Sequence, residues 1–208
     1  MSIEELYVKH VYNTIAKEFS DTRYRPWTCV EEFLDGVEAN SYIGDIGCGN
    51  GKNMLYRKDC HNYGCDFSKE LVKICNDQKL NVVEGDVLNI PYESNYFDYT
   101  MCIAVLHHLS TECKRKLAIN ELIRITKPGG KILILVWALE QEQDSRRKFI
   151  EQENYVDWRN KSKKLLGKRY YYVFKKGELE NLILNKKSVK LVRRFYERGN
   201  HGIILEKV

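Results

Sequence analysis

Strand-like and helix-like segments alternate between residues 41 and 137 of this 208-residue chain, and this alternation constrains the fold most. Such an order is typical of a parallel sheet covered by helices on both faces. The run KILILVWAL is apolar almost throughout, as expected of a strand buried on both sides. We therefore predict an α/β, Rossmann-like, doubly wound fold. Its mostly parallel sheet would have seven strands, including an antiparallel C-terminal one.

The whole chain, residues 1–208, is expected to form one domain. Apolar residues at helical spacing predict a helix in the first 20 residues, and Pro26 can begin a second one. A final hairpin would turn near Gly199. The expected parts are N-terminal helices (1–40), a cofactor-binding core (41–141), a basic insertion on the substrate side (142–176), and a helix with the C-terminal hairpin (177–208).

A glycine-rich loop, Asp45-Ile46-Gly47-Cys48-Gly49-Asn50-Gly51, follows the first expected strand and precedes an expected helix. Glycines let the backbone turn tightly and approach a ligand closely. Asp66 ends the next strand, where a carboxylate can accept both hydroxyls of a ribose. Asp86 ends the third strand, where it can meet an adenine amino group. Together these acids predict a nucleoside site, although Asp66 could instead cap the helix starting at Phe67.

The loop differs from loops that bind phosphates. Its spacing is G-x-G-x-G rather than G-x-G-x-x-G, and it contains no Gly-Lys-Ser/Thr sequence. Asp45 would repel a pyrophosphate but would suit a ligand that carries an amine. S-adenosylmethionine carries an amine and no phosphate, so these residues favour it as the ligand.

Further motifs extend the pattern. The glycine loop, Asp66, Gly85-Asp86-Val87 and Phe97-Asp98 resemble the class I S-adenosylmethionine-dependent methyltransferases. A narrower resemblance, to the eukaryotic tRNA wobble-uridine carboxymethyl methyltransferase family, includes the fungal enzyme and the methyltransferase domain of its animal AlkB-homologue relative. The segments that carry it are 11–16, 22–27, 103–108, 137–141, 169–171, 177–179 and 196–200.

The resemblance implies methyl transfer from S-adenosylmethionine to the carboxylate of 5-carboxymethyluridine at the tRNA wobble position, which gives the methyl ester. It also implies a set of residues that bind the cofactor. These are Arg23, Asp45, Gly47, Cys48, Gly49, Asp66, Phe67, Asp86, Val87 and Ile103.

A carboxylate is ionised at pH 7 and needs no general base, so orientation matters more than proton transfer. An unpaired guanidinium could hold it through two hydrogen bonds. Arg25 is the first catalytic candidate and His107 the second, while Trp27 and Trp137 could stack on a flipped-out base.

These residues also have structural interpretations. Arg23 and Arg25 could pair with Asp21 or Glu31. The neighbouring histidines, including His108, could end a strand by bonding to backbone, and both tryptophans could serve as core anchors.

Residues 159–169 include six basic and no acidic side chains. We predict that this segment and residues 146–148 contact the phosphates of a tRNA anticodon stem-loop, with an ordinary solvated face as the alternative. The net charge of +5 permits such a partner without requiring it. The predicted substrate-binding set is Trp27, Trp137, Arg146, Arg147, Lys163 and Lys164.

Residues 80–84 are expected at an edge of the sheet. An edge strand without proline invites pairing with another chain, unless a local loop covers it. The resemblance implies a small zinc-binding activator protein that adds a strand near Val82 and forms a heterodimer.

Seven cysteines without a C-x-x-C pair, and no export signal, predict reduced thiols and no metal site. No apolar run reaches the about 18 residues of a membrane span. We expect a cytoplasmic or nuclear protein that binds no membrane.

Two other functions fit part of the sequence. A small-molecule (quinone-type) O- or C-methyltransferase shares the loop and the histidine pair, but the basic segment and residues 137–141 disfavour it. A non-catalytic RNA-binding module would not need the complete pocket. The exit of the fourth strand, IAVLHH, lacks the Asn/Asp-Pro-Pro-Tyr and Pro-Cys motifs of enzymes that methylate base amines or cytosine C5.

Overall fold

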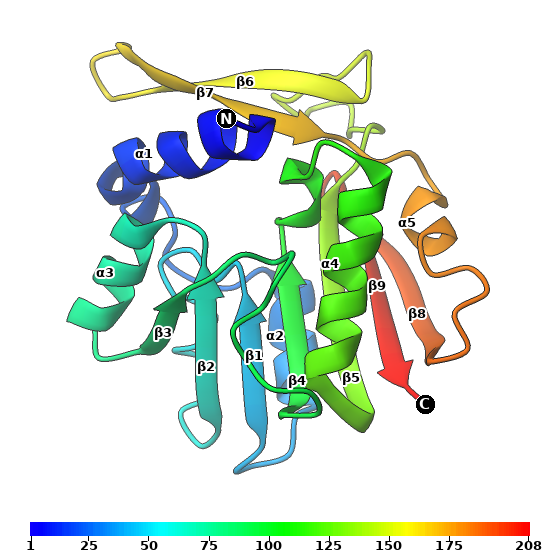
Figure 1. Cartoon of the computed structure of the whole chain (residues 1–208). Coiled ribbons are helices and arrows are strands. Elements are labelled where there is room, and N and C mark those ends of the chain that lie inside the picture. The colour runs from blue at the N-terminus through cyan, green and yellow to red at the C-terminus, as the bar shows by residue number, and fades with distance from the viewer.

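A computed structural model describes all 208 residues, which form a seven-stranded sheet and a separate two-stranded hairpin (Figure 1). The sheet order is β3-β2-β1-β4-β5-β9-β8, with five parallel strands and β9 antiparallel to both of its neighbours. This confirms the predicted fold and the C-terminal hairpin. The strands are β1 (Tyr42–Ile46), β2 (His61–Asp66), β3 (Asn81–Glu84), β4 (Phe97–Ile103), β5 (Thr126–Trp137), β8 (Val189–Glu197) and β9 (Asn200–Lys207).

The helices begin where their capping residues predict. The Ser68 hydroxyl accepts the N–H of Leu71, and the Thr111 hydroxyl accepts the N–H of Lys114. The helical elements are the π-helical turn η1 (Glu5–Lys9), α1 (His10–Ser20), α2 (Thr28–Asp35), α3 (Lys69–Asp77), the 3₁₀ turn η2 (Leu106–His108), α4 (Glu112–Ile125) and α5 (Glu178–Asn181). None of them is long and apolar enough to cross a membrane.

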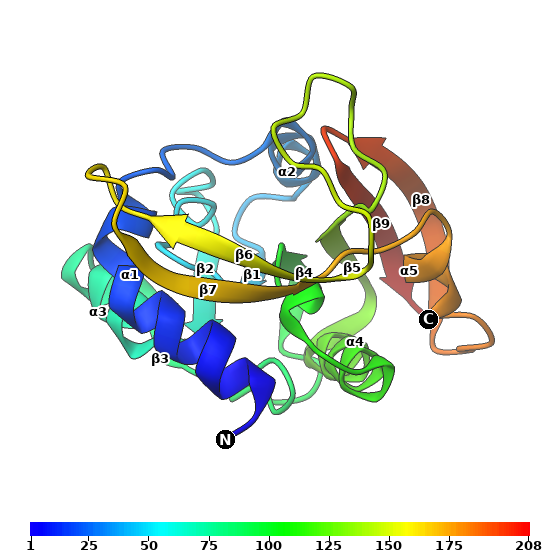
Figure 2. The ribbon, with the colours of Figure 1, turned by 90° about the horizontal axis from the view of Figure 1, so that it is seen from above.

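Strand β5 divides the core into two layers, because successive side chains of a strand point to opposite faces. Leu133 and Leu135 pack with residues of α2, whereas Ile132, Ile134 and Val136 pack with residues of α4. The two helices accordingly lie on opposite faces of the sheet (Figures 1 and 2). Full burial on both sides explains the continuous apolar run that the sequence shows here.

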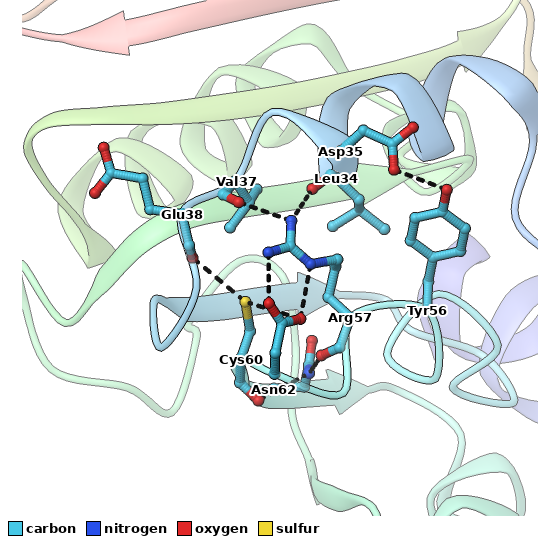
Figure 3. Close-up of polar contacts among 9 residues, drawn as sticks. Leu34, Asp35, Val37, Glu38, Tyr56, Arg57, Cys60 and Asn62 are labelled. Atoms are coloured by element: carbon cyan, nitrogen blue, oxygen red, sulfur yellow. Dashed lines mark hydrogen bonds and ion pairs between the residues drawn. The ribbon is translucent and has the colours of Figure 1, made fainter.

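The helix expected after the glycine loop does not form, and the segment runs in turns that are bonded to the end of α2. Arg57 donates to the carbonyls of Leu34 and Val37 at the end of α2 and pairs with Asp59 (Figure 3). Carbonyls at the end of a helix lack intrahelical partners, so the guanidinium satisfies groups that would otherwise need water. These bonds fasten the segment that follows the loop to α2.

A strand that the sequence analysis missed, β6 (Glu153–Arg159), pairs with β7 (Leu165–Tyr172). This hairpin and α1 cross above the carboxyl ends of the central strands (Figure 2). Exposed and half-buried residues alternate along β6, with Val156 and Trp158 on its inner side. That alternation was the available signal, but the exposed Tyr155 and the surrounding charges obscured it.

Candidate active site

A cavity of about 1060 Å³ lies between the carboxyl ends of the central strands and the cover formed by α1 and the β6–β7 hairpin. Thirteen of the predicted site residues line it: Arg23, Arg25, Trp27, Gly47, Gly49, Asp66, Phe67, Asp86, Val87, Ile103, His107, Trp137 and Arg147. Asp45, Cys48, Arg146, Lys163 and Lys164 do not line it. The N-terminal helices and the 142–176 insertion therefore contribute to the same cavity as the strand ends.

The glycine loop forms one wall of the cavity. Gly47 has φ +76°, and a Cβ there would lie 2.2 Å from a methyl carbon of Val105, so only glycine fits. The Gly49 N–H donates to Oδ2 of Asp66 at 2.8 Å, and Oδ1 of Asp66 accepts the N–H of Ser68 at 2.9 Å. Asp66 is thereby fixed between the loop and the start of α3, at the position predicted for a ribose.

Asp45 is buried directly beneath this loop, with an exposed fraction of 1%. Burial raises the pKa of its carboxyl group to about 7, although the Asn53 amide donates to Oδ2 at 3.2 Å and acts to lower it. Oδ1 has no hydrogen-bond partner in the chain. A buried acceptor left unsatisfied fits a ligand that brings cationic groups to this loop, as S-adenosylmethionine does.

We predict that Asp45→Asn stabilises the donor-free protein much more at pH 8 than at pH 4.5, and that it weakens donor binding. The pKa of this carboxyl group is near 3.8 in the unfolded chain and near 7 in the folded protein. The folding stability lost by ionising the buried group therefore grows as the pH rises across that interval. Above pH 7 this cost is complete, on the order of 4 kcal/mol. Thermal melts of both proteins at the two pH values measure it. An equal shift in melting temperature at both pH values would contradict the prediction.

The two buried histidines are held as neutral rings. The backbone N–H of Trp137 donates to Nδ1 of His107 at 3.0 Å, so the ring proton of His107 resides on Nε2. Nδ1 of His108 lies 2.7 Å from the Tyr170 carbonyl and must donate to it, which leaves Nε2 as the acceptor for the Tyr12 hydroxyl at 3.1 Å. Burial lowers the pKa of His107 well below its ordinary value and that of His108 to about 3.

Arg25 is not the unpaired guanidinium that the sequence suggested. Its Nη2 donates to both carboxylate oxygens of Glu31 at 3.1 Å, and its side chain is 77% exposed. Arg23 instead lies over the ring of Phe19 at 4.8 Å, and its carbonyl accepts the amide of Asn50 in the glycine loop. The catalytic role of Arg25 stays a prediction, because an ion pair does not decide it.

Aromatic side chains form a further part of the cavity wall. Trp137 stacks on Tyr171 with ring centres 4.1 Å apart, and the Arg147 guanidinium lies 4.4 Å from the Trp137 ring centre. Trp27 lies near the ammonium group of Lys52, at 5.5 Å. Tyr12, Tyr171 and Arg169 belong to this wall but were missing from the predicted site. The segment Arg169-Tyr170-Tyr171 carried part of the family resemblance and was the available signal.

Comparisons with known proteins agree with this geometry. Residues 44–134 match a family model described as a methyltransferase domain. The chain is 40% identical to the Schizosaccharomyces pombe protein named tRNA (carboxymethyluridine(34)-5-O)-methyltransferase, over 98% of this chain and 97% of that protein. It is 50% identical to the Arabidopsis thaliana protein of the same name over 143 residues, which are 69% of this chain but only 35% of that longer protein.

Solved structures share the fold at low identity. A SAM dependent methyltransferase from Aquifex aeolicus superposes with a TM-score of 0.68 at 20% identity, covering 94% of this chain and 98% of that one. A putative methyltransferase solved in complex with the Haloferax volcanii Trm112 methyltransferase activator gives 0.67 at 14% identity, covering 97% and 98%. The fixed Asp66 and the glycine loop are suited to the ribose and methionine portions of S-adenosylmethionine, the donor that the sequence predicts. The chain belongs to the tRNA (carboxymethyluridine(34)-5-O)-methyltransferase family.

Proposed function

We propose that this chain transfers the methyl group of S-adenosylmethionine to the carboxylate of 5-carboxymethyluridine at the tRNA wobble position, forming the methyl ester. The observation that carries the proposal is that neither cavity histidine is free to act as a base. Nδ1 of His107 is occupied by the Trp137 N–H, and Nε2 of His108 accepts from Tyr12. A carboxylate acceptor is already ionised near pH 7, so it needs no base.

The reaction requires alignment rather than proton transfer. The bond between sulfur and the methyl carbon breaks as a carboxylate oxygen bonds to that carbon, so the sulfonium becomes a neutral thioether. Asp66 and the glycine loop hold the donor, and α1 with the β6–β7 hairpin covers the cavity. This cover keeps water from the carboxylate and holds it in line with the methyl group. The Nε2–H group of His107 can donate a hydrogen bond to the carboxylate.

The anticodon stem-loop of tRNA is the proposed substrate surface, with the β6–β7 hairpin as its binding element. Lys163 and Lys164 lie in the connection between the two strands and are exposed. The exposed Arg146 precedes the hairpin, and the partly buried Arg147 lines the cavity. Basic side chains thus lie both at the hairpin tip and beside the cavity, where phosphates could contact them.

The proposal is tested with labelled S-adenosylmethionine and bulk tRNA from cells that lack the ester. Mild alkali should release the label from tRNA, because it hydrolyses methyl esters. Label that resists alkali lies on a base or ribose and contradicts the proposal. Transfer only to small quinone-type acceptors, with none to tRNA, would favour the small-molecule O- or C-methyltransferase alternative.

We also propose that a small zinc-binding activator pairs with the free edge of β3 to form a heterodimer. The strand stands at the edge of the sheet, and the Haloferax neighbour was solved as a complex with the Trm112 methyltransferase activator. Val82, near which the added strand was expected, is not the residue that faces a partner. Val82 is 5% exposed and packs with Cys48 and Cys75, whereas Val83 is 44% exposed.

Val83→Lys should lower the affinity for a Trm112-type activator by about tenfold or more, because it places a charge on the pairing edge. The donor affinity should not change. Val192→Lys, on the opposite edge strand β8 and 48% exposed, is the matched control. Co-purification and titration with the activator measure both. Loss of binding only in the Val192 variant would assign the activator to β8.

All seven cysteines are free, and most are buried. Free thiols suit a reducing compartment, and we place the chain in the cytoplasm or the nucleus on that ground.

A further inference from the structure

Arg169 is a buried cation without a carboxylate partner. It lies on β7, has an exposed fraction of 6% and lines the cavity. Its Nε has no hydrogen-bond partner, and the groups that act on the guanidinium are the phenols of Tyr171 and Tyr12, with no carboxylate among them. A buried charge is costly unless it is paired, so this site is arranged for an anion that the chain does not itself supply.

Aromatic rings hold the guanidinium in place. Its central carbon lies 4.7 Å from the ring centre of Trp158, 5.2 Å from that of Tyr171 and 6.0 Å from that of Tyr12. Cation–π contacts stabilise the charge and orient the planar group without using its hydrogen-bond donors. Apart from a side-chain hydrogen bond to Tyr12, the guanidinium donors, Nε among them, are left for a ligand.

The other groups near Arg169 leave the chamber positive. Arg23 and Arg147 also line the cavity, and His108 beside it is neutral. The acids of the same cavity are engaged elsewhere: Glu4 with Lys114 and Ser110, Glu5 with Ser2, Asp66 with backbone N–H groups of Gly49 and Ser68, and Asp86 with the Leu88 N–H. No acidic side chain competes for Arg169.

We propose that Arg169 binds the carboxylate of the acceptor nucleoside and makes the site select an acid over the corresponding amide. The inference deepens the proposed function and rests on it. Arg23 is the better candidate for the carboxylate of the donor, because Asn50 ties its backbone to the glycine loop. Arg169 lies 5.2 Å from the ring centre of Tyr171, which stacks on Trp137, the residue predicted to hold the acceptor base. A planar guanidinium can hold a carboxylate through two parallel hydrogen bonds.

This assignment also explains how product could leave. Methylation converts the carboxylate into a neutral ester, so the ion pair with Arg169 exists with the substrate and is lost with the product. The same cation that favours binding of the acid therefore does not retain the ester.

The test compares binding of the free nucleosides 5-carboxymethyluridine and 5-carbamoylmethyluridine to the protein saturated with S-adenosylhomocysteine. The wild type should bind the acid about tenfold or more tightly than the amide. Arg169→Gln should bring that ratio close to about 1 while donor affinity stays within about twofold. Arg169→Lys should retain part of the preference, because it keeps the charge but not the fork. Arg159→Gln is the control on the same hairpin; Arg159 is exposed and paired with Asp157.

Specific outcomes overturn the proposal. If the preference persists in Arg169→Gln but disappears in Arg25→Gln, the carboxylate binds at the rim instead. If Arg169→Gln loses donor affinity and keeps the preference, Arg169 serves the donor. If Arg169→Gln does not fold, as judged by its melting curve, Arg169→Lys takes its place in the test. A lysine variant that binds the acid as tightly as the wild type does, and keeps the full preference for acid over amide, then overturns the proposal. A wild type that forms the alkali-labile ester on tRNA yet binds acid and amide equally refutes this inference alone, whereas a wild type that forms no ester refutes the proposed function.

Discussion

Asp66→Ala is expected to weaken the binding of S-adenosylmethionine by about 100-fold or more. Two charge-assisted hydrogen bonds to the ribose hydroxyls would be lost, at about 1.5–3 kcal/mol each. The structure adds a second reason. Oδ2 of Asp66 accepts the Gly49 N–H, so alanine also releases the loop that the donor contacts. The loss of the bonds from Gly49 and Ser68 should cost a further small part of the folding stability.

Calorimetric titration measures the affinity for S-adenosylmethionine. Thermal melts measure the stability of each variant, so that a loss of affinity can be told from a loss of folding. Asp98→Ala is the matched control, because Asp98 also accepts a backbone N–H, that of Tyr42, and pairs with Lys127. Asp98 stands near the start of β4, outside the donor cavity. The control should lower the melting temperature and leave donor affinity unchanged. Equal losses of affinity in both variants would mean that Asp66 acts through the fold and not through the ribose.

The core of the fold could be predicted because its sequence signals are local. Residues 132–136 are apolar on both faces of their strand, and Ser68 and Thr111 cap the helices that follow them. The glycine loop and the acids at the strand ends then located the donor site. Since parallel strands end at the same edge of a sheet, positions far apart in sequence could be assigned to one site.

The cover of the cavity could not be predicted in the same way, because tertiary contacts determine it. Residues 153–159 form a strand only by pairing with β7 above α1, and their charged outer face hides the apolar inner one. Arg57 likewise replaces an expected helix by turns through bonds to the distant carbonyls of Leu34 and Val37.

The pairing of arginines was the least predictable feature of the site. The sequence favoured Arg25 as the cation for the carboxylate and gave no reason to prefer Arg169. Only the structure shows that Glu31 neutralises the first, whereas aromatic rings surround the second. Contacts between distant segments decide which arginine lacks a carboxylate partner. Such contacts cannot be predicted from a local sequence pattern.

Binding of tRNA should depend steeply on salt through the β6–β7 hairpin. Lys161, Lys163, Lys164 and Lys168 are exposed, and none of them pairs with an acid. If they contact about four phosphates, the slope of log affinity against log salt should be about −3, because each contact releases a counterion. Between about 50 and 200 mM salt, that slope corresponds to a loss of about 60-fold.

Replacing these four lysines by serine should flatten the slope towards zero and leave donor affinity unchanged. The matched control removes the same charge elsewhere, from the exposed residues Lys58, Lys187, Lys190 and Arg194, which do not line the cavity. Because net charge falls equally in both variants, a difference between their slopes reports position and not total charge. Binding isotherms of an anticodon stem-loop at several salt concentrations give both slopes. Equal flattening in the two variants would show that tRNA responds only to net charge, and the hairpin would then be ordinary solvated surface.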